Sequence, residues 1–573
     1  MDMIGGIFVR GFGGIMQGVP SAAAVSMVSG GGLYISPQIS LYGAPHPRVG
    51  TLGLQTYVGV FDGELYNREA LAKELATLGY RFATDDDTAL VLHAYMAWGA
   101  GCLERFVGIF ALAIWNEECL FMARDRVGGK SLFYRTSNRW QFATSWNLLF
   151  TEPEEKLTLT AEGAAELLLL GPGRTPGCGV LEGFHELQPG HYLQYRLGDT
   201  PKPTRYWTLQ AHPHLHDFPD TCKHVQTLLN NAVSEQSDKN TGVLLSGGLD
   251  SSILAALARC KSTFSLDFIG NDATDESDAP YIKEMTQHLR ADHQLTLLGT
   301  DELADALPAA MEARGLPGMA DVDASLLLFF QRIHEKNTVV LSGDGADEFF
   351  GGYPWFIDEA LRNGKGFPWS NNVEYRAGFL HPRIRQQIDA AAFVQKRFDE
   401  TIGNAPTLYD DTADDKQVRR LTALHFHWFM QTLNTRTAAM AAAAGMTVRM
   451  PFLDHRVLEY MYNVPWVMKN HDNREKGLLR QAFKSLLPKK IVNRKKAPFP
   501  KTHNPAFTQK VTDLMQNLLN KPYAPLFQIL NRQNLNAQSN THWYGQLMAR
   551  PQMLAYFLQI NAWLEKYDIR VAL

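Results

Sequence analysis

The segment Val243-Leu244-Leu245-Ser246-Gly247-Gly248-Leu249-Asp250-Ser251-Ser252 decides the fold of the larger part of this chain. A short apolar run leads into a turn of small residues, and the apolar spacing from about Ile253 predicts a helix. A strand, a glycine-rich turn and a helix start bind phosphate well, because the helix end supplies unsatisfied N–H groups and a positive dipole. We therefore expect a ligand with phosphate groups at this turn.

The side chains of this turn indicate how such a ligand would be held. Glycines let the backbone approach the phosphates, and serine hydroxyls add donors. The expected contacts are Ser246, Gly247, Gly248, Ser251 and Ser252. Asp250 would repel a phosphate unless a cation lay between them, so its carboxylate predicts Mg²⁺. A turn that binds no ligand is the alternative interpretation.

A second loop, Leu341 to Tyr353, also follows a short apolar run, at 338–341. Together with the apolar run 263–268 and the segment above, these runs are typical of buried parallel strands in an α/β sheet. Both loops should then emerge at the carboxyl ends of the strands, where ligands bind. Asp347 could be a second metal carboxylate, and Asp344 a base or an electrostatic group that faces the substrate.

The length of 573 residues predicts two domains, because one ordinary core does not grow so large. Residues 1–205 show short strands interrupted by helices at 67–78 and 87–98, which predicts an α+β layered domain. Residues 220–573 should form the α/β domain. The proline-containing stretch 199–219 is the expected linker.

Composition excludes several classes of function. A net charge of −4 gives no general reason to expect nucleic acid or an acidic membrane as partner. Five scattered cysteines do not form a disulfide framework or a zinc site, which favours the cytoplasm. Asp2 and Arg10 disfavour a signal peptide, and no apolar run approaches the roughly 20 residues of a membrane span. We interpret the acidic run 410–415 as a solvated loop, and His425 and His427 as packing residues.

The two loops resemble those of the class B asparagine synthetases, and further motifs support the resemblance over nearly the whole chain. These motifs are Gly315 to Asp323, Pro451 to Arg456, Arg474 to Arg480 and Arg494 to Pro505. The resemblance implies an ATP-pyrophosphatase (adenine nucleotide α-hydrolase-like) fold with ATP and Mg²⁺ as cofactors. It also implies adenylation of a carboxylate, release of pyrophosphate and attack by an amine on the acyl-adenylate.

The resemblance also implies roles for individual residues. Asp250 and Asp347 would hold Mg²⁺, and Lys476 would stabilise the charge that develops at the acyl centre. Asp344 would be a second catalytic group. The nucleotide contacts would be Leu244, Ser246, Gly247, Gly248, Asp250, Ser251, Ser252, Leu266 and Gly343.

In the first domain the resemblance is to the glutaminase part of these enzymes, an Ntn-hydrolase-like fold, through Phe61 to Asn67 and Ala123 to Tyr134. The nucleophile of that part is an amino-terminal cysteine whose own amine is the base. Here Gly5 occupies its place, and Asp62 replaces the asparagine of the oxyanion hole.

The segment that should carry an arginine for glutamine is unrecognisable around 41–54, although Asp87 keeps one glutamine contact. We therefore expect a degenerate glutaminase domain that hydrolyses no glutamine.

Without glutamine, the amine must come from elsewhere. β-Lactam synthetases and lasso-peptide cyclases are relatives that lack the cysteine, because their amine is already attached to the substrate. Where close asparagine synthetases carry Asp-Arg-Met-Ser-Met, this chain has Ala438, Ala439 and Ala441, which indicates a reshaped pocket or simply a good helix former. Asp344 and Thr435 stand where clavam-type β-lactam synthetases carry a tyrosine–glutamate pair, so that pair is absent.

We expect an intramolecular amide, such as a β-lactam of the tabtoxin type, on a small amino-acid-like or short peptide substrate. The alternatives are ammonia-dependent asparagine formation, a macrolactam cyclase and a nucleotide-binding pseudoenzyme. A homodimer is left open. Survival of Asp250, Asp347 and Lys476 disfavours the pseudoenzyme, because a scaffold has no need of that set.

Overall fold

The computed structural model describes the chain in two compact units. The described residues are 12–16, 24–28, 31–35, 39–43, 47–81, 86–136, 140–150, 156–196, 198–269, 277–370, 372–497, 504–536 and 548–572. The first unit comprises Met1–Lys156 with Pro176–Thr208, and the second comprises Leu157–Thr175 with Leu209–Leu573. No helix in these ranges is long and apolar enough to cross a membrane.

This division differs from the linear split expected at 1–205 and 220–573, because Leu157–Thr175 leaves the first unit. Within that segment, β11 (Thr158–Leu159) pairs in parallel with β20 (Arg570–Val571) near the other end of the chain. The Tyr556 hydroxyl also donates to the Leu167 carbonyl oxygen at 2.8 Å. Such pairings between distant segments leave no local signal in the sequence.

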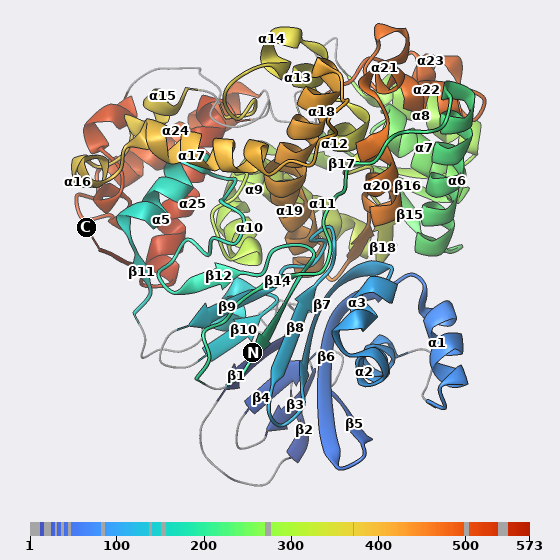
Figure 1. Ribbon diagram of the computed structural model, residues 1–573. Helices are drawn as coiled ribbons and strands as arrows, with labels where there is room; N and C mark the ends of the chain where they lie inside the picture. The colour runs from blue at the N-terminus through green and yellow to red at the C-terminus, as the bar shows by residue number, and fades with distance from the viewer. Residues whose placement is uncertain are drawn as a thin grey trace. The chain divides into compact units, whose positions relative to one another are not determined.

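The first unit contains two antiparallel sheets (Figure 1). The strands of the first, in the order β12-β9-β10-β1-β4-β3-β2, are β12 (Phe184–Glu186), β9 (Phe133–Thr136), β10 (Trp140–Ala143), β1 (Phe12–Met16), β4 (Ile39–Gly43), β3 (Gly31–Ile35) and β2 (Ala24–Val28). The strands of the second, in the order β14-β13-β8-β7-β6-β5, are β14 (Thr204–Arg205), β13 (His191–Tyr195), β8 (Leu120–Arg124), β7 (Gly108–Trp115), β6 (Gln55–Leu65) and β5 (Arg48–Leu52).

Apolar side chains on both faces of the second sheet build two cores. One core includes Met122 of β8 and Trp140 of the other sheet, so the two sheets pack face to face. The other core joins the second sheet to α1 (Arg68–Thr77) and α2 (Asp87–Trp98). The alternation of strand side chains between faces explains this arrangement. The predicted α+β layering is confirmed, as are the two helices.

The second unit is built on a parallel sheet in the order β17-β16-β15-β18-β19. Its strands are β17 (Asp292–Leu298), β16 (Ser262–Phe268), β15 (Gly242–Leu244), β18 (Val339–Leu341) and β19 (Thr447–Arg449). The three central strands are the three apolar runs that the sequence indicates, so the α/β prediction is confirmed. The edge strands were not predicted, because β17 exposes several side chains and β19 has only 3 residues.

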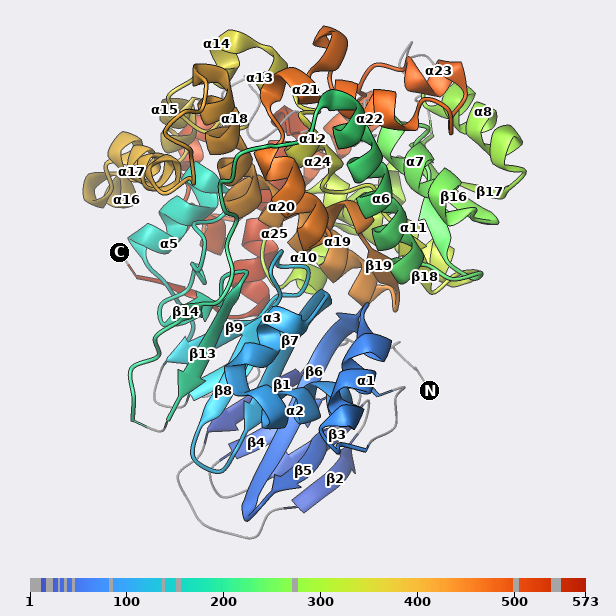
Figure 2. The same ribbon diagram turned by 45° about the vertical axis from the view of Figure 1, so that its right-hand side comes forward.

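Helices surround this sheet and build the rest of the second unit (Figure 2). Their bounds are α6 (Phe218–Gln236), α7 (Leu249–Ala258), α8 (Ala279–Leu289), α10 (Leu307–Arg314), α11 (Asp321–His334), α12 (Ala346–Phe350), α17 (Ala390–Gly403), α18 (Ala413–Leu424), α19 (Met430–Ala443), α20 (His455–Asn463), α22 (Gly477–Phe483), α23 (Lys489–Val492), α24 (Pro505–Leu519) and α25 (Arg550–Lys566). Helix α7 starts at Leu249, earlier than the expected start near Ile253, because Gly248 is extended and caps it.

The acidic run 410–415 is only in part the solvated loop that its composition indicates, because Asp410 and Asp414 are exposed but two of its aspartates are paired within the fold. The Asp411 carboxylate lies 3.1 Å from Arg419 of α18 and is only 6% exposed. Asp415 accepts a hydrogen bond from the Trp466 backbone N–H at 2.6 Å. These acidic groups fix the start of α18, because buried cations and backbone donors need acceptors.

Candidate active site

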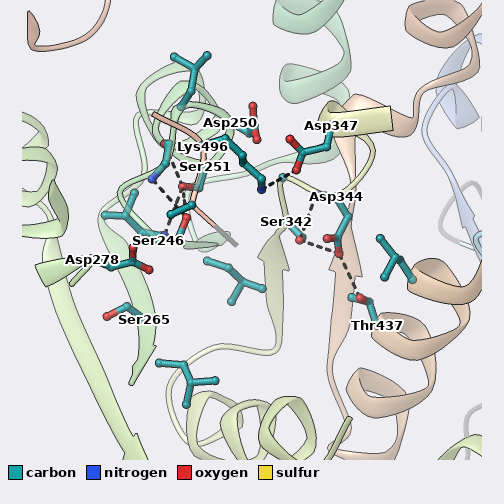
Figure 3. Close-up of a pocket in the computed structure, with 18 of the residues that line it drawn as sticks. Ser246, Asp250, Ser251, Ser265, Asp278, Ser342, Asp344, Asp347, Thr437 and Lys496 are labelled. Carbon is teal, nitrogen blue, oxygen red and sulfur yellow. Dashed lines mark hydrogen bonds and ion pairs between the residues drawn. The ribbon is translucent and has the colours of Figure 1, made fainter. Parts of the chain in front are cut away.

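The loops after β15 and β18 meet at one edge of the parallel sheet, because the two strands are neighbours. Together with residues of α19 and the segment 476–497, they enclose a cavity of about 240 Å³ (Figure 3). The sequence-predicted residues that line it are Leu244, Ser246, Gly248, Asp250, Ser251, Leu266, Gly343, Asp344, Asp347 and Lys476. Residues that lie more than 200 positions apart in the chain thus surround one space.

Two predicted contacts, Gly247 and Ser252, are not among the residues that line the cavity. Gly247 has a φ of +68°, and a Cβ there would lie 2.7 Å from the Cβ of Tyr281 in α8. The glycine therefore serves a turn and close packing. Ser252 is fully buried. Because α7 starts at Leu249, Ser252 belongs to the inward side of the first turn of this helix.

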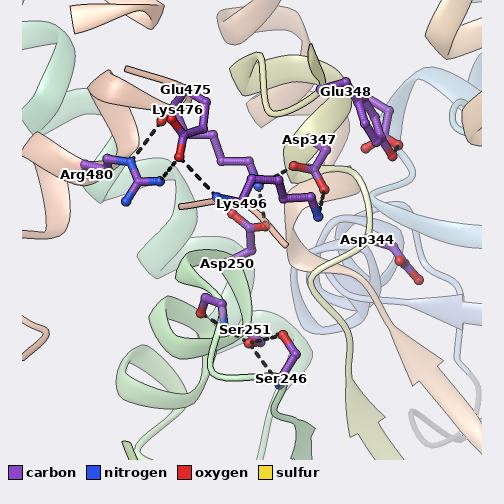
Figure 4. A network of polar contacts seen from close by, with 12 residues as sticks. Ser246, Asp250, Ser251, Asp344, Asp347, Glu348, Glu475, Lys476, Arg480 and Lys496 are labelled. Carbon is purple, nitrogen blue, oxygen red and sulfur yellow. Dashed lines mark hydrogen bonds and ion pairs between the residues drawn. The ribbon is translucent and has the colours of Figure 1, made fainter. Parts of the chain in front are cut away.

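Lys476 lies between the two carboxylates that were expected to hold a metal (Figure 4). Its ammonium group contacts Asp250 and lies 2.5 Å from Asp347 Oδ1. The Lys496 Nζ lies 2.7 Å from Asp347 Oδ2. Lys496 stands in a motif that the sequence singled out, but this position was not predicted.

Charge pairing overrides burial at two members of this cluster. Burial alone favours the neutral form of each group, but Asp250 and Asp347 hold the pKa of Lys476 above its usual value. In the same way, Lys476 and Lys496 hold the pKa of Asp347 well below its usual value despite burial. Lys476 and Asp347 are therefore charged at neutral pH, whereas burial raises the pKa of Asp250 although Lys476 opposes the shift. Lys476, which stands at a helix start, is thus a buried cation that is only 3% exposed.

The backbone around Lys476 explains how it reaches this position. Lys476 has a φ of +54° and precedes α22, so the chain turns sharply there. A Cβ on Gly352 would lie 1.8 Å from Asp347 Oδ1 and 2.3 Å from Lys476 Cε. Only glycine at position 352 leaves room for this ion pair. Gly352 is thus a requirement of the site.

Asp250 and Asp347 fit a magnesium ion as two of its ligands. Both carboxylates face one cation, the Lys476 ammonium, and Asp250 Oδ1 is buried without a hydrogen-bond partner among the described residues. The same described residues contain no cluster of three or more metal-binding side chains. Mg²⁺ commonly takes one or two carboxylates and completes its shell with phosphate oxygens and water, so two suffice here.

Hydrogen bonds order the phosphate-binding turn. The Ser246 and Ser251 hydroxyls lie 3.2 Å apart, and the Gly248 N–H donates to Ser246 Oγ at 3.3 Å. Arg494 donates to the Ser246 carbonyl oxygen at 2.8 Å and lies over the Tyr281 ring. Arg494 therefore couples the turn to the segment that carries Lys496. Its motif was recognised in the sequence, but its partners could not be inferred.

On the other side of the cavity, Asp344 is held by two hydroxyl groups. Its Oδ2 accepts hydrogen bonds from Ser342 Oγ and from Thr437 Oγ1, each at 3.1 Å (Figure 3). Thr435, which aligns with the glutamate of the clavam-type pair, instead donates to the Gln431 carbonyl oxygen of its own helix. The contact with Asp344 thus comes from a different threonine of α19.

Aromatic rings form the wall beside Asp344. Tyr353, Trp355 and Phe429 all line the cavity. The Tyr353 ring stacks on Trp355 with centroids 4.8 Å apart, and Phe429 stands edge-on to Tyr353. Of α19, the cavity is lined by Leu433, Arg436 and Thr437, while Ala438, Ala439 and Ala441 are not among its described lining residues. The alanines therefore do not reshape this pocket directly.

Buried polar groups support the aromatic wall from behind. The Tyr353 hydroxyl donates to Glu348 at 2.8 Å, and burial together with the charge of Asp347 raises the pKa of Glu348 to about 7. The Trp355 N–H donates to His425 Nε2 at 2.6 Å. Burial lowers the pKa of His425 to about 3, so this imidazole is neutral. The packing interpretation of His425 is confirmed.

In the first unit, both carboxylates expected to face glutamine are paired with cations of this chain. Lys130 Nζ lies 2.8 Å from Asp62, and Arg68 lies 2.9 Å from Asp87. Burial raises the pKa of Asp87 although Arg68 opposes the shift. Gly5, which we expect to stand in place of the cysteine nucleophile, lies outside the described residues.

The second unit therefore combines a parallel sheet, a phosphate-binding turn and a charged cavity, which define a nucleotide-dependent α/β enzyme. Comparison with known proteins agrees. The sequence model described as asparagine synthase matches residues 224–565, and that of a glutamine amidotransferase domain matches residues 53–207.

Curated relatives are similar to most of the chain. Asparagine synthetase [glutamine-hydrolyzing] 3 of Bacillus subtilis is 37% identical over 561 residues, which cover 93% of this chain and 91% of that protein. Asparagine synthetase [glutamine-hydrolyzing] 1 of the same organism is 26% identical, covering 78% of this chain and 76% of that protein. The chain belongs to the asparagine synthase family and is an ATP-dependent carbon–nitrogen ligase.

Proposed function

We propose that this protein is an AMP-forming amide synthetase that uses no glutamine and closes an intramolecular amide, such as a β-lactam, on an amino-acid-like substrate. The observation that carries the first part is the pairing of Asp62 with Lys130 and of Asp87 with Arg68. A carboxylate already neutralised by its own chain is a poor contact for the glutamine amine. Gly5 in place of the cysteine removes the nucleophile.

In the synthetase unit, each group has a role that its position suits. Asp250 and Asp347 would hold Mg²⁺, which neutralises phosphate charge when bound. Ser246, Gly248 and Ser251 would contact the phosphates. Lys476 would stabilise charge at the acyl centre. Leu244, Leu266 and Gly343, which line the cavity, would contact the nucleoside part.

The wall of Tyr353, Trp355 and Phe429 supports a substrate with an apolar body. The amine of such a substrate would be held near its own adenylate, which replaces a bimolecular encounter. Asp344 would take the proton from that amine. A tabtoxin-type β-lactam synthetase, derived directly from an asparagine synthetase, fits this combination.

Ammonia-dependent asparagine formation is the second candidate, because Asp344 is acidic where clavam-type cyclases carry tyrosine. The 37% identity with an asparagine synthetase also favours it. Both candidates share adenylation and differ in the source of the amine.

The test is pyrophosphate release by the purified protein with ATP and Mg²⁺. The substrates are aspartate with ammonium, aspartate with glutamine, and a panel of β-amino acids and dipeptides. Release with a β-amino acid that then loses water, and none with aspartate, supports cyclisation. Release with aspartate and ammonium supports the second candidate. Turnover that requires glutamine, with glutamate as product, would overturn the glutamine-independent assignment.

A further inference from the structure

The carboxylate of Asp344 has one fixed oxygen and one open oxygen. Ser342 and Thr437 both donate to Oδ2, each at 3.1 Å. The other oxygen, Oδ1, has no hydrogen-bond or ion-pair partner among the described residues, and Asp344 lines the cavity. Because hydrogen bonds hold Oδ2 in place, Oδ1 points in a defined direction. This orientation suits a carboxylate that must accept a proton from a ligand.

Thr437 differs from the neighbouring threonines of α19. Thr432 donates to the Trp428 carbonyl oxygen at 3.2 Å, and Thr435 donates to that of Gln431 at 2.8 Å. These bonds to the preceding turn are the usual choice of a helical threonine. Thr437 reaches across to the loop after β18 instead, 93 positions away in the chain. Its hydroxyl therefore serves the site.

We propose that Thr437 is a positioning residue, which orients Asp344 so that Oδ1 takes the proton of the attacking amine. The inference deepens the proposed function and rests on it. As the amine nitrogen bonds to the acyl carbon, its N–H bond breaks and the proton moves to Oδ1. The bond from the acyl carbon to the AMP oxygen then breaks, and AMP leaves with the electron pair.

Other charged and titratable groups lie around Asp344. Its charge acts on Glu348 of α12 and on Tyr353 in the loop that follows, and Asp347 of α12 and Arg436 of α19 line the same cavity. These groups are the same in every variant below, so a difference between variants reports the threonine. Loss of the Thr437 hydroxyl removes one of the two hydrogen bonds to Oδ2, so Oδ1 is held less well toward the amine.

The experiment compares Thr437→Val, which removes the hydroxyl at constant shape, with Thr437→Ser, which keeps it. Thr435→Val is the matched control on the same helix. Two rates are measured: ATP–pyrophosphate exchange and amide formation over a range of pH. The probe is aspartate with ammonium chloride or, if that pair is inert, the β-amino acid that supports exchange.

For Thr437→Val we expect exchange within about twofold of the unsubstituted protein and amide formation lowered about 10- to 100-fold. Thr437→Ser should restore the rate of amide formation, and Thr435→Val should leave both rates unchanged.

Equal effects of Thr437→Val and Thr435→Val, or an equal loss of exchange and amide formation, would overturn the positioning role. If the unsubstituted protein shows no exchange with any acid, the proposed function fails and this inference with it. If the unsubstituted protein is active and Thr437→Val shows the same rates of exchange and amide formation, the positioning role is refuted but the proposed function is not.

Discussion

Lys476 shows how much a single residue depends on its surroundings. By type it is an ordinary helix lysine, but it is buried between Asp250 and Asp347. A buried ammonium between two carboxylates is a preformed cation site, because burying unpaired charges would be costly. Asp250 and Asp347 would hold a magnesium ion there, and the ion would supply positive charge to the phosphates.

Replacing Lys476 by alanine should therefore separate binding from chemistry. We expect Lys476→Ala to bind ATP within a few-fold of the unsubstituted protein, because the phosphate turn is unchanged. Amide formation should fall at least about 100-fold, since a preorganised cation is lost. Equilibrium binding and product analysis provide the measurement. Lys489→Ala, an exposed lysine of α23, is the control, and an active Lys476→Ala protein would refute the role.

Asp250 tests the metal site separately. Asp250→Asn keeps the shape of the side chain but removes a negative charge that Mg²⁺ needs. We expect adenylation to fall about 100-fold at ordinary Mg²⁺ concentrations and to recover partly at high concentration. Pyrophosphate exchange over a Mg²⁺ titration measures this. The control is Asp301→Asn, because the Asp301 side chain is 82% exposed. This variant should show the same Mg²⁺ titration as the unsubstituted protein. An unaltered titration for Asp250→Asn would rule out the metal assignment.

At the scale of elements, helix starts and loops place the functional groups. The loop before α11 brings Met319 to the cavity, and the next residue, Ala320, has a φ of +52° and a ψ of −120°. A residue with a Cβ is strained in this region, which favours glycine. The local backbone thus carries strain where the chain enters the site.

Comparison of two alanines measures this strain. Ala324→Gly within α11 should cost about 2 kcal/mol, because a buried methyl group and helix propensity are both lost. Ala320 is equally buried. Ala320→Gly should nevertheless cost under about 1 kcal/mol, because relief of the left-handed strain offsets the loss. Denaturant unfolding of both variants provides the values, and equal losses would show that Ala320 is unstrained.

At the scale of the whole molecule, a charge buried away from the site contributes to the pH dependence of stability. Lys469 is only 2% exposed, and burial together with nearby Arg419 lowers its pKa to about 7 from 10.5. Between these two values the Lys469 side chain binds a proton in the unfolded chain but not in the folded chain. The contribution of Lys469 to the free energy of unfolding therefore rises as pH increases from about 7 to 10.5, by up to about 1.4 kcal/mol per pH unit.

Lys469→Met should remove this dependence and be the more stable protein at pH 6, where the native lysine is charged at a cost. Urea unfolding near pH 6, 8 and 9.5 measures the slope for both proteins. Lys489→Met, at an exposed position, should keep the original slope. The same slope in Lys469→Met and in the unsubstituted protein would contradict the assignment to Lys469.

Local patterns were sufficient for the fold and for half of the site. The apolar runs of β15, β16 and β18 predict buried parallel strands, and the small residues after β15 predict the phosphate-binding turn. Asp250 and Asp347 were recognised from the same loops. Each of these signals lies within about ten residues of chain, where strand and helix periodicity act directly.

Tertiary structure alone decided how distant residues meet. The fold places the ammonium groups of Lys476 and Lys496 against Asp347. It makes Thr437, and not Thr435, the hydrogen-bond partner of Asp344. It also pairs Asp62 with Lys130. Packing also places Gly247 against Tyr281 and buries Ser252, so neither lines the cavity. These contacts join segments far apart in the chain, so they depend on how layers pack and which charges burial forces together. The sequence by itself determined the elements and the kind of chemistry, and packing determined which side chains face the cavity.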